Sequence, residues 1–523
     1  MSLVDSPFLD RLNTNYVPSD SEILDIRLLL MDPADELARL DAQIEEMDIT
    51  LSLLKEKRTS LKAPIDAHRA LISPMRHVPL DVLQEVFLSC LPFEHNALID
   101  PTEAPLLLGR ICRHWRRVAY STPMLWSSIY ILSLNYGHTS PSLLSKLERL
   151  VEAWLERSAT CPLSVSLFDT TSIFEFNKDH PLILSLLPIS RRICDLALSG
   201  NAQFFLPLLQ LGSEDLPLLK RIRIQSTANS IIDNHLEAAN VFQIPTLEEV
   251  ALHLIESVDP LSLPLRWSQL TALNLGCDRA WTGNSQGGGL DFDGALDVLR
   301  RCPNLRRCEL RITKIPEDPG LTRAPDTSPI MLPQMHTLVF LGLLHFQKWP
   351  SHLVVPKLCC LQLGYADIGD TACVRGEYIR ADIDPTHFTS SSFRELLQSF
   401  PMMSHLRLSS SICSYGPSIT PNDELLTLLH DLCPMLTHFA VLPGAGISEA
   451  AFSALVKARM TMPIPLQQVQ LHFRWPLDPE VDITPDLRPF VADGLQIDIQ
   501  YAPQASNGNF FPREGLYKPV SLY

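Results

Sequence analysis

The sequence is poor in glycine and rich in proline, an unusual combination for a chain that is not of low complexity. Its 523 residues include 21 glycines and 42 prolines, while hydrophobic residues make up 46% of the chain. Disordered chains have too little apolar surface to form a core, so this composition excludes disorder over most of the length. The length leaves room for roughly two to four domains or for one long array of repeats.

Three further absences limit where the protein works. No apolar stretch reaches the roughly 18 residues that a membrane helix needs. The acidic N-terminal region lacks the basic start of a signal peptide. The 12 cysteines include no C-x-x-C pair, so neither a disulfide framework nor a zinc site is indicated. We therefore expect no membrane contact, no metal site and a cytoplasmic or nuclear location.

Positive charge and catalytic motifs are also scarce. The formal charge is −16, from 43 basic and 59 acidic residues, whereas nucleic-acid binding needs a basic surface. The sequence contains none of the motifs G-x-S-x-G, H-E-x-x-H, G-x-x-x-x-G-K-[ST] and G-x-G-x-x-G. We therefore expect that the protein binds no nucleic acid, uses no cofactor and is not an enzyme.

The N-terminal region divides into two segments. Residues 1–33 are acidic, and we expect them to be irregular or disordered. In residues 34–73, apolar side chains recur at alternating spacings of three and four, as at the a and d positions of a coiled coil. This seam contains Leu37, Leu40, Ile44, Met47, Leu51, Leu54, Arg58 and Leu61, and Pro64 is expected to end or kink the helix. The seam fits either a homodimer through residues 34–63 or one helix folded back on its own domain.

Residues 74–126 contain three short helical patterns. Pro79 suits the first turn of the first helix, where its missing N–H has no partner in any case. The apolar faces of the first two patterns consist of Leu80, Leu83, Val86 and Phe87, and of Leu108, Ile111, Trp115 and Val118. The third pattern is S-T-P-M-L-W. A module of about 50 residues cannot bury all its apolar surface, so part of that surface should meet a partner or the next domain.

The ordered elements V-P-L-D-V-L-Q-E-V-F, I-C-R-H-W-R-R-V-A and P-M-L-W resemble an F-box. Together with the segment before it, the layout is similar to the F-box-like proteins abundant in mushroom-forming fungi (basidiomycetes). The resemblance implies a helical bundle that docks on the Skp-type adaptor of a Skp–cullin–F-box ubiquitin ligase. It also implies adaptor-binding or fold-critical roles for Pro79, Leu80, Leu83, Val86, Phe87, Ile111, Cys112, Trp115, Val118 and Trp126.

Helix and strand patterns alternate along the rest of the chain. Residues 127–170 contain a helical pattern at 142–157 and a first strand in C-P-L-S-V-S-L-F. Residues 171–475 contain the motif L-x-x-L-x-L, in which other apolar residues can substitute. It begins at Ile193, Leu219, Leu247, Leu270, Leu305, Met335, Leu358, Met403, Leu436 and Leu466. Residues 476–523 are expected to form a C-terminal strand and tail.

Each motif predicts one short strand followed by a return segment, and neither piece can bury its apolar face alone. The copies should therefore stack side by side, with parallel strands, into an α/β solenoid that follows a mainly α N-terminal part. The pattern resembles irregular leucine-rich repeats of the kind found behind F-boxes, and an ordinary α/β domain is the alternative. Residues 278–293, 316–329 and 366–390 are expected to be loops that interrupt the array.

In such a solenoid the residues that flank the inward apolar positions lie on the concave face of the sheet. Those predicted to face a substrate are Arg221, Arg223, Arg307, Glu309, Arg311, His405, Arg407 and His438, and Gln468, Gln470 and His472 share the face. Because arginine pairs well with carboxylates and phosphates, we hypothesise that this face recognises an acidic or phosphorylated segment. A merely solvated sheet face is the alternative.

The sequence therefore suggests a substrate receptor without a catalytic site of its own. In this hypothesis the F-box binds the adaptor, and through it the cullin, while the repeats bind an unknown target protein. The alternative is a non-catalytic scaffold that dimerises through its N-terminal helix and uses the F-box-like module only as a structural cap.

Overall fold

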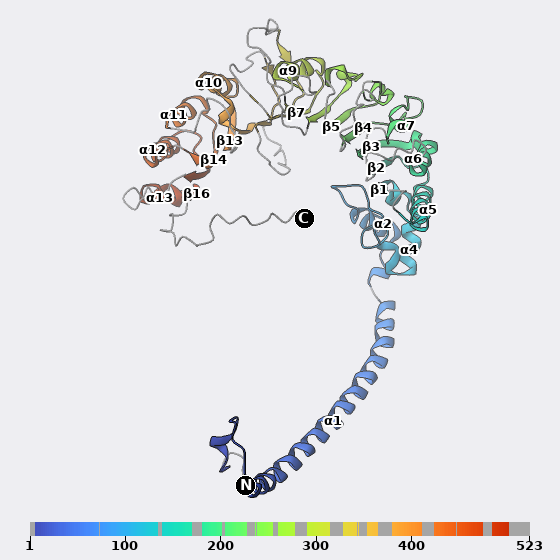
Figure 1. Ribbon diagram of the computed structural model, residues 1–523. Coiled ribbons are helices and arrows are strands. Elements are labelled where there is room, and N and C mark those ends of the chain that lie inside the picture. Colours follow the sequence, from blue (N-terminus) through green and yellow to red (C-terminus); the bar gives the residue numbers. More distant parts are fainter. Residues whose placement is uncertain are drawn as a thin grey trace. The chain divides into compact units, whose positions relative to one another are not determined.

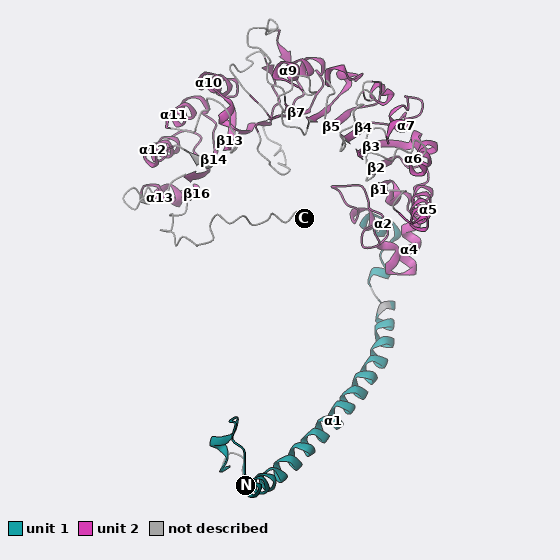
Figure 2. Ribbon diagram, viewed as in Figure 1, with its two compact units in different colours: residues 1–86 teal, residues 87–523 magenta. Residues whose placement is uncertain are grey.

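The computed structural model describes residues 6–72, 74–133, 139–169, 180–200, 204–226, 236, 238–254, 260–277, 290–313, 328–342, 344, 353–364, 379–409, 423–445, 447–473 and 484–501. The chain divides into two compact units, residues 1–86 (unit 1) and residues 87–523 (unit 2), as Figure 2 shows.

Unit 1 consists mainly of one long helix. Helix α1 spans Asp20–Leu71, 52 residues in all, and follows the short turn η2 at Leu9–Arg11 (Figure 1). The carboxylate of Glu22 accepts hydrogen bonds from the backbone N–H and the hydroxyl of Ser19, both at 2.8 Å. These bonds, followed by those from Tyr16 and Arg11, lower the pKa of Glu22 to about 2. Polar groups at the start of a helix lack hydrogen-bond partners within the helix. Because this arrangement pairs such groups, it stabilises the first turn of α1.

The expectation that residues 1–33 are irregular is wrong for residues 20–33, which belong to α1. The helix also continues through Pro33 and Pro64, so it does not end at Pro64. Each proline removes one backbone donor, but the turns on either side keep their hydrogen bonds. A long, firmly started helix can therefore include a proline that would end a short one.

Short helices lead from α1 to the sheet. The turn η3 (Pro74–Arg76) and helix α2 (Leu80–Ser89) come first, and the boundary between the two units falls within α2. In unit 2 the helices α3 (Leu108–Ile111) and α4 (Arg113–Tyr120) and the turn η4 (Pro123–Trp126) follow. Cys112 separates α3 from α4, and its Sγ accepts a hydrogen bond from the N–H of Trp115 at 3.4 Å, which caps α4.

The described part of unit 2 forms one sheet of 14 parallel strands, whose order follows the chain. They are β1 Ser128–Ser133, β2 Leu163–Asp169, β3 Ile193–Gly200, β4 Arg221–Ser226, β5 Glu249–Leu254, β6 Ala272–Cys277, β7 Arg307–Ile312, β9 Thr337–Gly342, β11 Cys360–Leu363, β12 Ile379–Ile383, β13 Met403–Ser409, β14 His438–Ala445, β15 Gln468–Phe473 and β16 Gln496–Gln500. The strands β8 (Ile330–Met331) and β10 (Leu353–Val354) pair separately. A sheet without reversal of strand order is a solenoid rather than a doubly wound α/β domain.

Described helices and turns connect most of the successive strands, and the helices lie along one side of the sheet (Figure 1). The helices are α5 Pro141–Arg157, α6 Pro181–Leu186, α7 Leu206–Leu209, α9 Phe292–Arg301, α10 Ser390–Ser399, α11 Asp423–Leu432, α12 Glu449–Met460 and α13 Thr484–Ala492. The turns are η5 Leu187–Arg192, η6 Asn240–Gln243, η7 Pro260–Ser262, η8 Trp267–Gln269 and η9 Pro385–His387. The core lies between these segments and the sheet, because the strand residues that point toward them are buried.

All ten predicted motifs coincide with strands of this sheet. Two strands begin at the first apolar residue of the motif, Ile193 and Met403, and the other eight begin two residues later. The second and third apolar positions enter the core, as Cys308 and Leu310 do in β7 with no exposed surface. The predicted parallel-stranded solenoid is therefore confirmed at the level of strand arrangement.

The solenoid is longer than the sequence indicated. Strands β1 and β2 belong to the same sheet, so it begins before residue 171, and β16 extends it beyond residue 475. The segment 366–390, expected to be a loop, contains β12 and the start of α10. Strand β12 has the sequence I-R-A-D-I, whose central inward residue is only an alanine, so its apolar signal is weak. Of the other two expected loops, residues 278–289 and 316–327 lie outside the described residues.

Candidate interaction surfaces

Aromatic packing holds the helical segment of unit 2 together. The rings of Phe87 and Trp115 lie 4.8 Å apart, with Phe87 fully buried. Trp126 is also fully buried, and its indole N–H donates a hydrogen bond to the carbonyl of Ala119 at 2.8 Å. Its ring meets the edge of Trp154 on α5 at 4.8 Å. The helical segment of unit 2 and the first helix of the solenoid therefore share a core.

Burial divides the residues predicted to bind an adaptor. Leu83, Phe87, Val118 and Trp126 are buried, and Trp115 is half-buried. The exposed members are Pro79, Leu80 and Val86 in unit 1, and Ile111 and Cys112 in unit 2. These exposed residues and the exposed part of Trp115 can contact a partner directly, whereas the buried residues are already enclosed within the protein. Among the other exposed apolar residues of this segment that sequence reasoning missed are Leu107 and Met124.

One face of the sheet, here called the polar face, carries two rows of residues in cross-strand register. The first row contains Ser128, Ser164, Asp195, Arg221, Glu249, Ala272, Arg307, Thr337, Cys360, Arg380, His405, His438, Gln468 and Gln496. The second contains Tyr130, Ser166, Ala197, Arg223, Ala251, Asn274, Glu309, Val339, Gln362, Asp382, Arg407, Ala440, Gln470 and Asp498. Arg311 and His472 follow on the same side of their strands. The structure thus places the residues predicted to face a substrate on one face.

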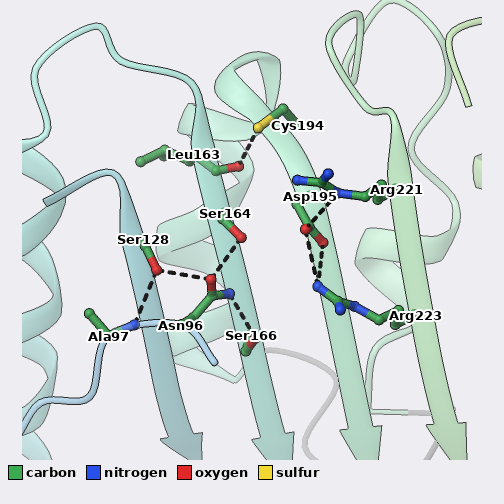
Figure 3. A network of polar contacts seen from close by, with 10 residues as sticks. All are labelled: Asn96, Ala97, Ser128, Leu163, Ser164, Ser166, Cys194, Asp195, Arg221 and Arg223. Atoms are coloured by element: carbon green, nitrogen blue, oxygen red, sulfur yellow. Dashed lines mark hydrogen bonds and ion pairs between the residues drawn. The ribbon is translucent and has the colours of Figure 1, made fainter. Parts of the chain in front are cut away.

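Asp195 binds two of the predicted arginines. Its buried carboxylate accepts a hydrogen bond from the Nε of Arg221 at 2.9 Å and from a terminal nitrogen of Arg223 at 3.1 Å (Figure 3). The side chain of Asp195 is only 5% exposed, whereas both arginines are about half exposed. Because both arginines share one carboxylate, these three residues, here called the Asp195 cluster, hold the two guanidinium groups in fixed positions. The carboxylate also partly neutralises the positive charge that the guanidinium groups present to a ligand.

A polar network anchors the loop at residues 92–96 to the beginning of the sheet. The side-chain oxygen of Asn96 accepts hydrogen bonds from Ser128 and Ser164, and its nitrogen donates one to Ser166 at 2.8 Å (Figure 3). The neighbouring Ala97 N–H donates to the Ser128 hydroxyl at 3.1 Å. A single asparagine side chain thereby joins the loop to two strands.

The loop and strands β1–β5 border a hollow of about 610 Å³. Its lining includes the Asp195 cluster, Tyr130 and Glu249, and on the loop side Phe93 and His95. Phe93 is 94% exposed, so a large aromatic ring stands in solvent at the edge of a polar hollow. A smaller hollow of about 190 Å³ follows along the face and is lined by Arg307, Glu309 and other residues. Exposed aromatic rings beside polar groups are characteristic of protein-binding surfaces.

A second charged group lies farther along the polar face. Burial raises the pKa of Asp382, which accepts a hydrogen bond from Ser409 at 2.9 Å and lies 3.8 Å from the Nε of Arg407. The rings of His405 and His438 are stacked with centroids 3.9 Å apart. Burial, with added repulsion from His438 and Arg380, lowers the pKa of His405 to about 4. This imidazole is therefore neutral at physiological pH.

The two rows balance their charges. They hold five arginines and five acidic residues, and Asp195, Glu249 and Asp382 were not among the residues predicted from the sequence. The polar face therefore carries mixed charge rather than a continuous basic stripe. Among the described residues the side chain of Arg307 forms no hydrogen bond or ion pair. Of the arginines that line the two hollows, Arg307 therefore keeps its full charge for a partner.

The described ranges contain neither a cluster of metal ligands nor a membrane-spanning helix. No group of three or more histidine, cysteine, aspartate or glutamate side chains is placed to hold a metal ion. None of the described helices combines the length and the apolar character that a bilayer crossing requires. Comparison of the sequence with protein-family models and with curated proteins finds no match.

Proposed function

We propose that this protein is the substrate receptor of a Skp–cullin–F-box ubiquitin ligase. In this proposal the short helices within residues 74–126 bind the Skp-type adaptor, and the solenoid, together with the loop at residues 92–96, binds the protein to be modified. The observation that carries the proposal is the exposure of apolar side chains on the F-box-like helices, above all Ile111, which is 53% exposed. Apolar residues at this density on short helices favour a protein partner.

The proposal assigns no chemical step to this chain. Ubiquitin transfer would belong to the conjugating enzyme that the cullin recruits. The receptor would hold its target near that enzyme, and such positioning accelerates a reaction by converting a bimolecular encounter into a local one. A non-catalytic scaffold would differ in one respect, because its helical segment would only cap the solenoid and would not bind an adaptor.

An exposed position on α3 tests adaptor binding. Replacing Ile111 with aspartate should reduce recovery of a Skp-type adaptor with the tagged chain at least about tenfold, because the change puts an unpaired charge into an apolar contact. The fold should survive, since Ile111 is already half in solvent. Copurification followed by quantification of the adaptor measures the effect.

Leu143 on α5 provides the matched control, because it is 49% exposed but lies outside the F-box-like segment. Leu143→Asp should leave adaptor recovery unchanged. Absence of the adaptor from the wild-type preparation, or equal recovery with Ile111→Asp, would exclude the ligase function and favour the scaffold. Substitutions at Leu83 or Trp115 are less informative, because those side chains also help to hold the fold.

We place the target-binding site at the loop 92–96 and the adjoining hollow on the polar face. Phe93 offers an apolar anchor, and the Asp195 cluster and Arg307 offer charged groups in fixed positions. An acidic or phosphorylated segment would bind to the guanidinium of Arg307. The mixed charge of the face also suits a segment that carries both signs.

Phe93→Asp tests this placement in the native cell. Proximity labelling with the variant should lose most of the proteins enriched by the wild-type chain, at least about tenfold in signal, because exposed aromatic anchors dominate binding energy. Adaptor recovery should not change. Leu184→Asp on α6 is the control, since that side chain is 44% exposed on a different element. An unaltered set of labelled proteins with Phe93→Asp would refute the site.

A further inference from the structure

The apolar seam of α1 is exposed along its whole length. Its seven apolar members, Leu37, Leu40, Ile44, Met47, Leu51, Leu54 and Leu61, are each between 44% and 63% exposed. Residues 37–61 span about 36 Å of helix, which is long enough for a coiled-coil contact. A continuous apolar stripe in solvent is unfavourable and indicates that another helix covers it.

The charge of α1 changes sign along the helix. Residues 32–48 hold seven acidic residues and one basic residue, whereas residues 55–69 hold five basic and two acidic residues. The middle of the seam lies between these two parts, near Ile49. A helix that runs in the opposite direction would therefore set acidic charge against basic charge at both ends.

The positions that flank the seam also favour a partner helix that runs in the opposite direction. The e positions are Asp41, Asp48, Lys55 and Lys62, and the g positions are Glu36, Gln43, Thr50 and Lys57. In a parallel pair each g position meets the following e position of the partner. That arrangement sets Glu36 against the partner's Asp41 and Lys57 against the partner's Lys62, so both charged pairs would repel.

We propose that α1 pairs with α1 of a second copy of this chain in an antiparallel coiled coil centred near Ile49. In this arrangement Leu37 packs against the partner's Leu61. The e positions then face e positions and the g positions face g positions. Asp41 lies beside the partner's Lys62, Asp48 beside the partner's Lys55, and Glu36 beside the partner's Lys57. All three pairs attract, and the symmetry of the dimer repeats each of them.

Arg58 supports the same direction. It occupies an a position, and in a parallel coiled coil each a position faces its own copy, so Arg58 would meet the partner's Arg58 in the core. In the antiparallel arrangement Arg58 lies opposite the partner's Leu40, and the partner's Asp41 comes next. The long side chain can cover that leucine while its guanidinium reaches the carboxylate.

Charge reversal at the e positions distinguishes the two directions. In the full chain, Lys55→Glu with Lys62→Glu should raise the dissociation constant of the antiparallel dimer about tenfold or more, because four attractive pairs become repulsive. In a parallel dimer the same double variant would relieve the repulsion with Lys57 and tighten binding. Adding Asp41→Lys and Asp48→Lys should restore the antiparallel dimer. Sedimentation equilibrium over a range of concentrations measures all three proteins.

Ser52→Glu with Thr59→Glu is the control, because it adds acidic residues at outward b positions and should leave the dimer intact. Circular dichroism verifies that every variant keeps its helix. A wild-type chain that stays monomeric at all concentrations would overturn the proposal in favour of a helix folded back on its own chain. Tighter association of the Lys55→Glu, Lys62→Glu variant, or no rescue by the further changes, would overturn the antiparallel direction. None of these outcomes depends on adaptor binding.

Discussion

Replacing Trp126 with alanine should lower the free energy of unfolding by about 4 kcal/mol, the cost of deleting a large buried aromatic side chain. The indole has no exposed surface and gives its N–H to the Ala119 carbonyl at 2.8 Å. Its ring also meets Trp154 at 4.8 Å, and the guanidinium of Arg157 lies 4.7 Å from its centroid. The alanine variant would lose these contacts and leave a cavity between η4 and α5.

Urea denaturation followed by far-ultraviolet circular dichroism measures this loss. Trp267→Ala is the matched control, because that residue is partly exposed on the short turn η8, and its removal should cost much less. Trp126→Phe should recover part of the stability, since it keeps a ring but loses the hydrogen bond. Equal effects of the two alanine variants would show that η4 and α5 do not share a core.

Replacing Arg459 with methionine should destabilise the C-terminal part of the solenoid by roughly 3 to 5 kcal/mol. This side chain is fully buried on α12, and burial lowers its pKa. Its guanidinium donates to the carbonyls of Cys433 and Leu436, at 2.9 and 2.7 Å, and to that of Pro434 at 3.3 Å. Methionine has a similar length, but it would leave these buried acceptors unpaired.

Arg459→Lys should restore little of the lost stability, because one ammonium group cannot reach three carbonyls from a single position. Lys457→Met on the same helix is the control. Lys457 forms an ion pair with Asp486 at 2.7 Å, but both side chains are about half exposed, so its loss should cost at most about 1 kcal/mol. Urea midpoints decide between these expectations. A midpoint for Arg459→Met as high as that for Lys457→Met would contradict the bonding role.

The repeat motif predicted strands well because it reports burial. In β4 the alternation Arg221, Ile222, Arg223, Ile224 specifies which residues enter the core, and the structure agrees. The motif failed for β12, where Ala381 is too small to give a strong apolar signal although it is buried. It did not identify β1 either, because the leading position of that motif is Trp126, which was assigned to the F-box-like segment.

The polar face illustrates a different limit of prediction from the sequence. The alternation that placed Arg221 also places Asp195, so the acid could have been assigned to the same face from the sequence. That Asp195 touches both Arg221 and Arg223 could not have been predicted, because the contact depends on the register between β3 and β4. Connecting segments of different length separate the strands, and the sequence does not specify the register across them. For the same reason, the sequence does not predict the hydrogen bonds that join the side chain of Asn96 to Ser128, Ser164 and Ser166.

The start of the N-terminal helix could have been predicted more accurately. Residues 1–33 were expected to be irregular, yet the bonds between Glu22 and Ser19 start α1 at Asp20. The spacing of Ser19 and Glu22 is that of a capping box, so these two residues predict where the helix starts.

Direct binding between the purified chain and a purified Skp-type adaptor tests the proposed function most directly. Isothermal titration calorimetry should give a complex with one adaptor per chain, and the Ile111→Asp chain should bind at least about tenfold more weakly. No heat of binding with a folded wild-type chain, or the same affinity for both proteins, would contradict the assignment of this solenoid as a ubiquitin-ligase receptor.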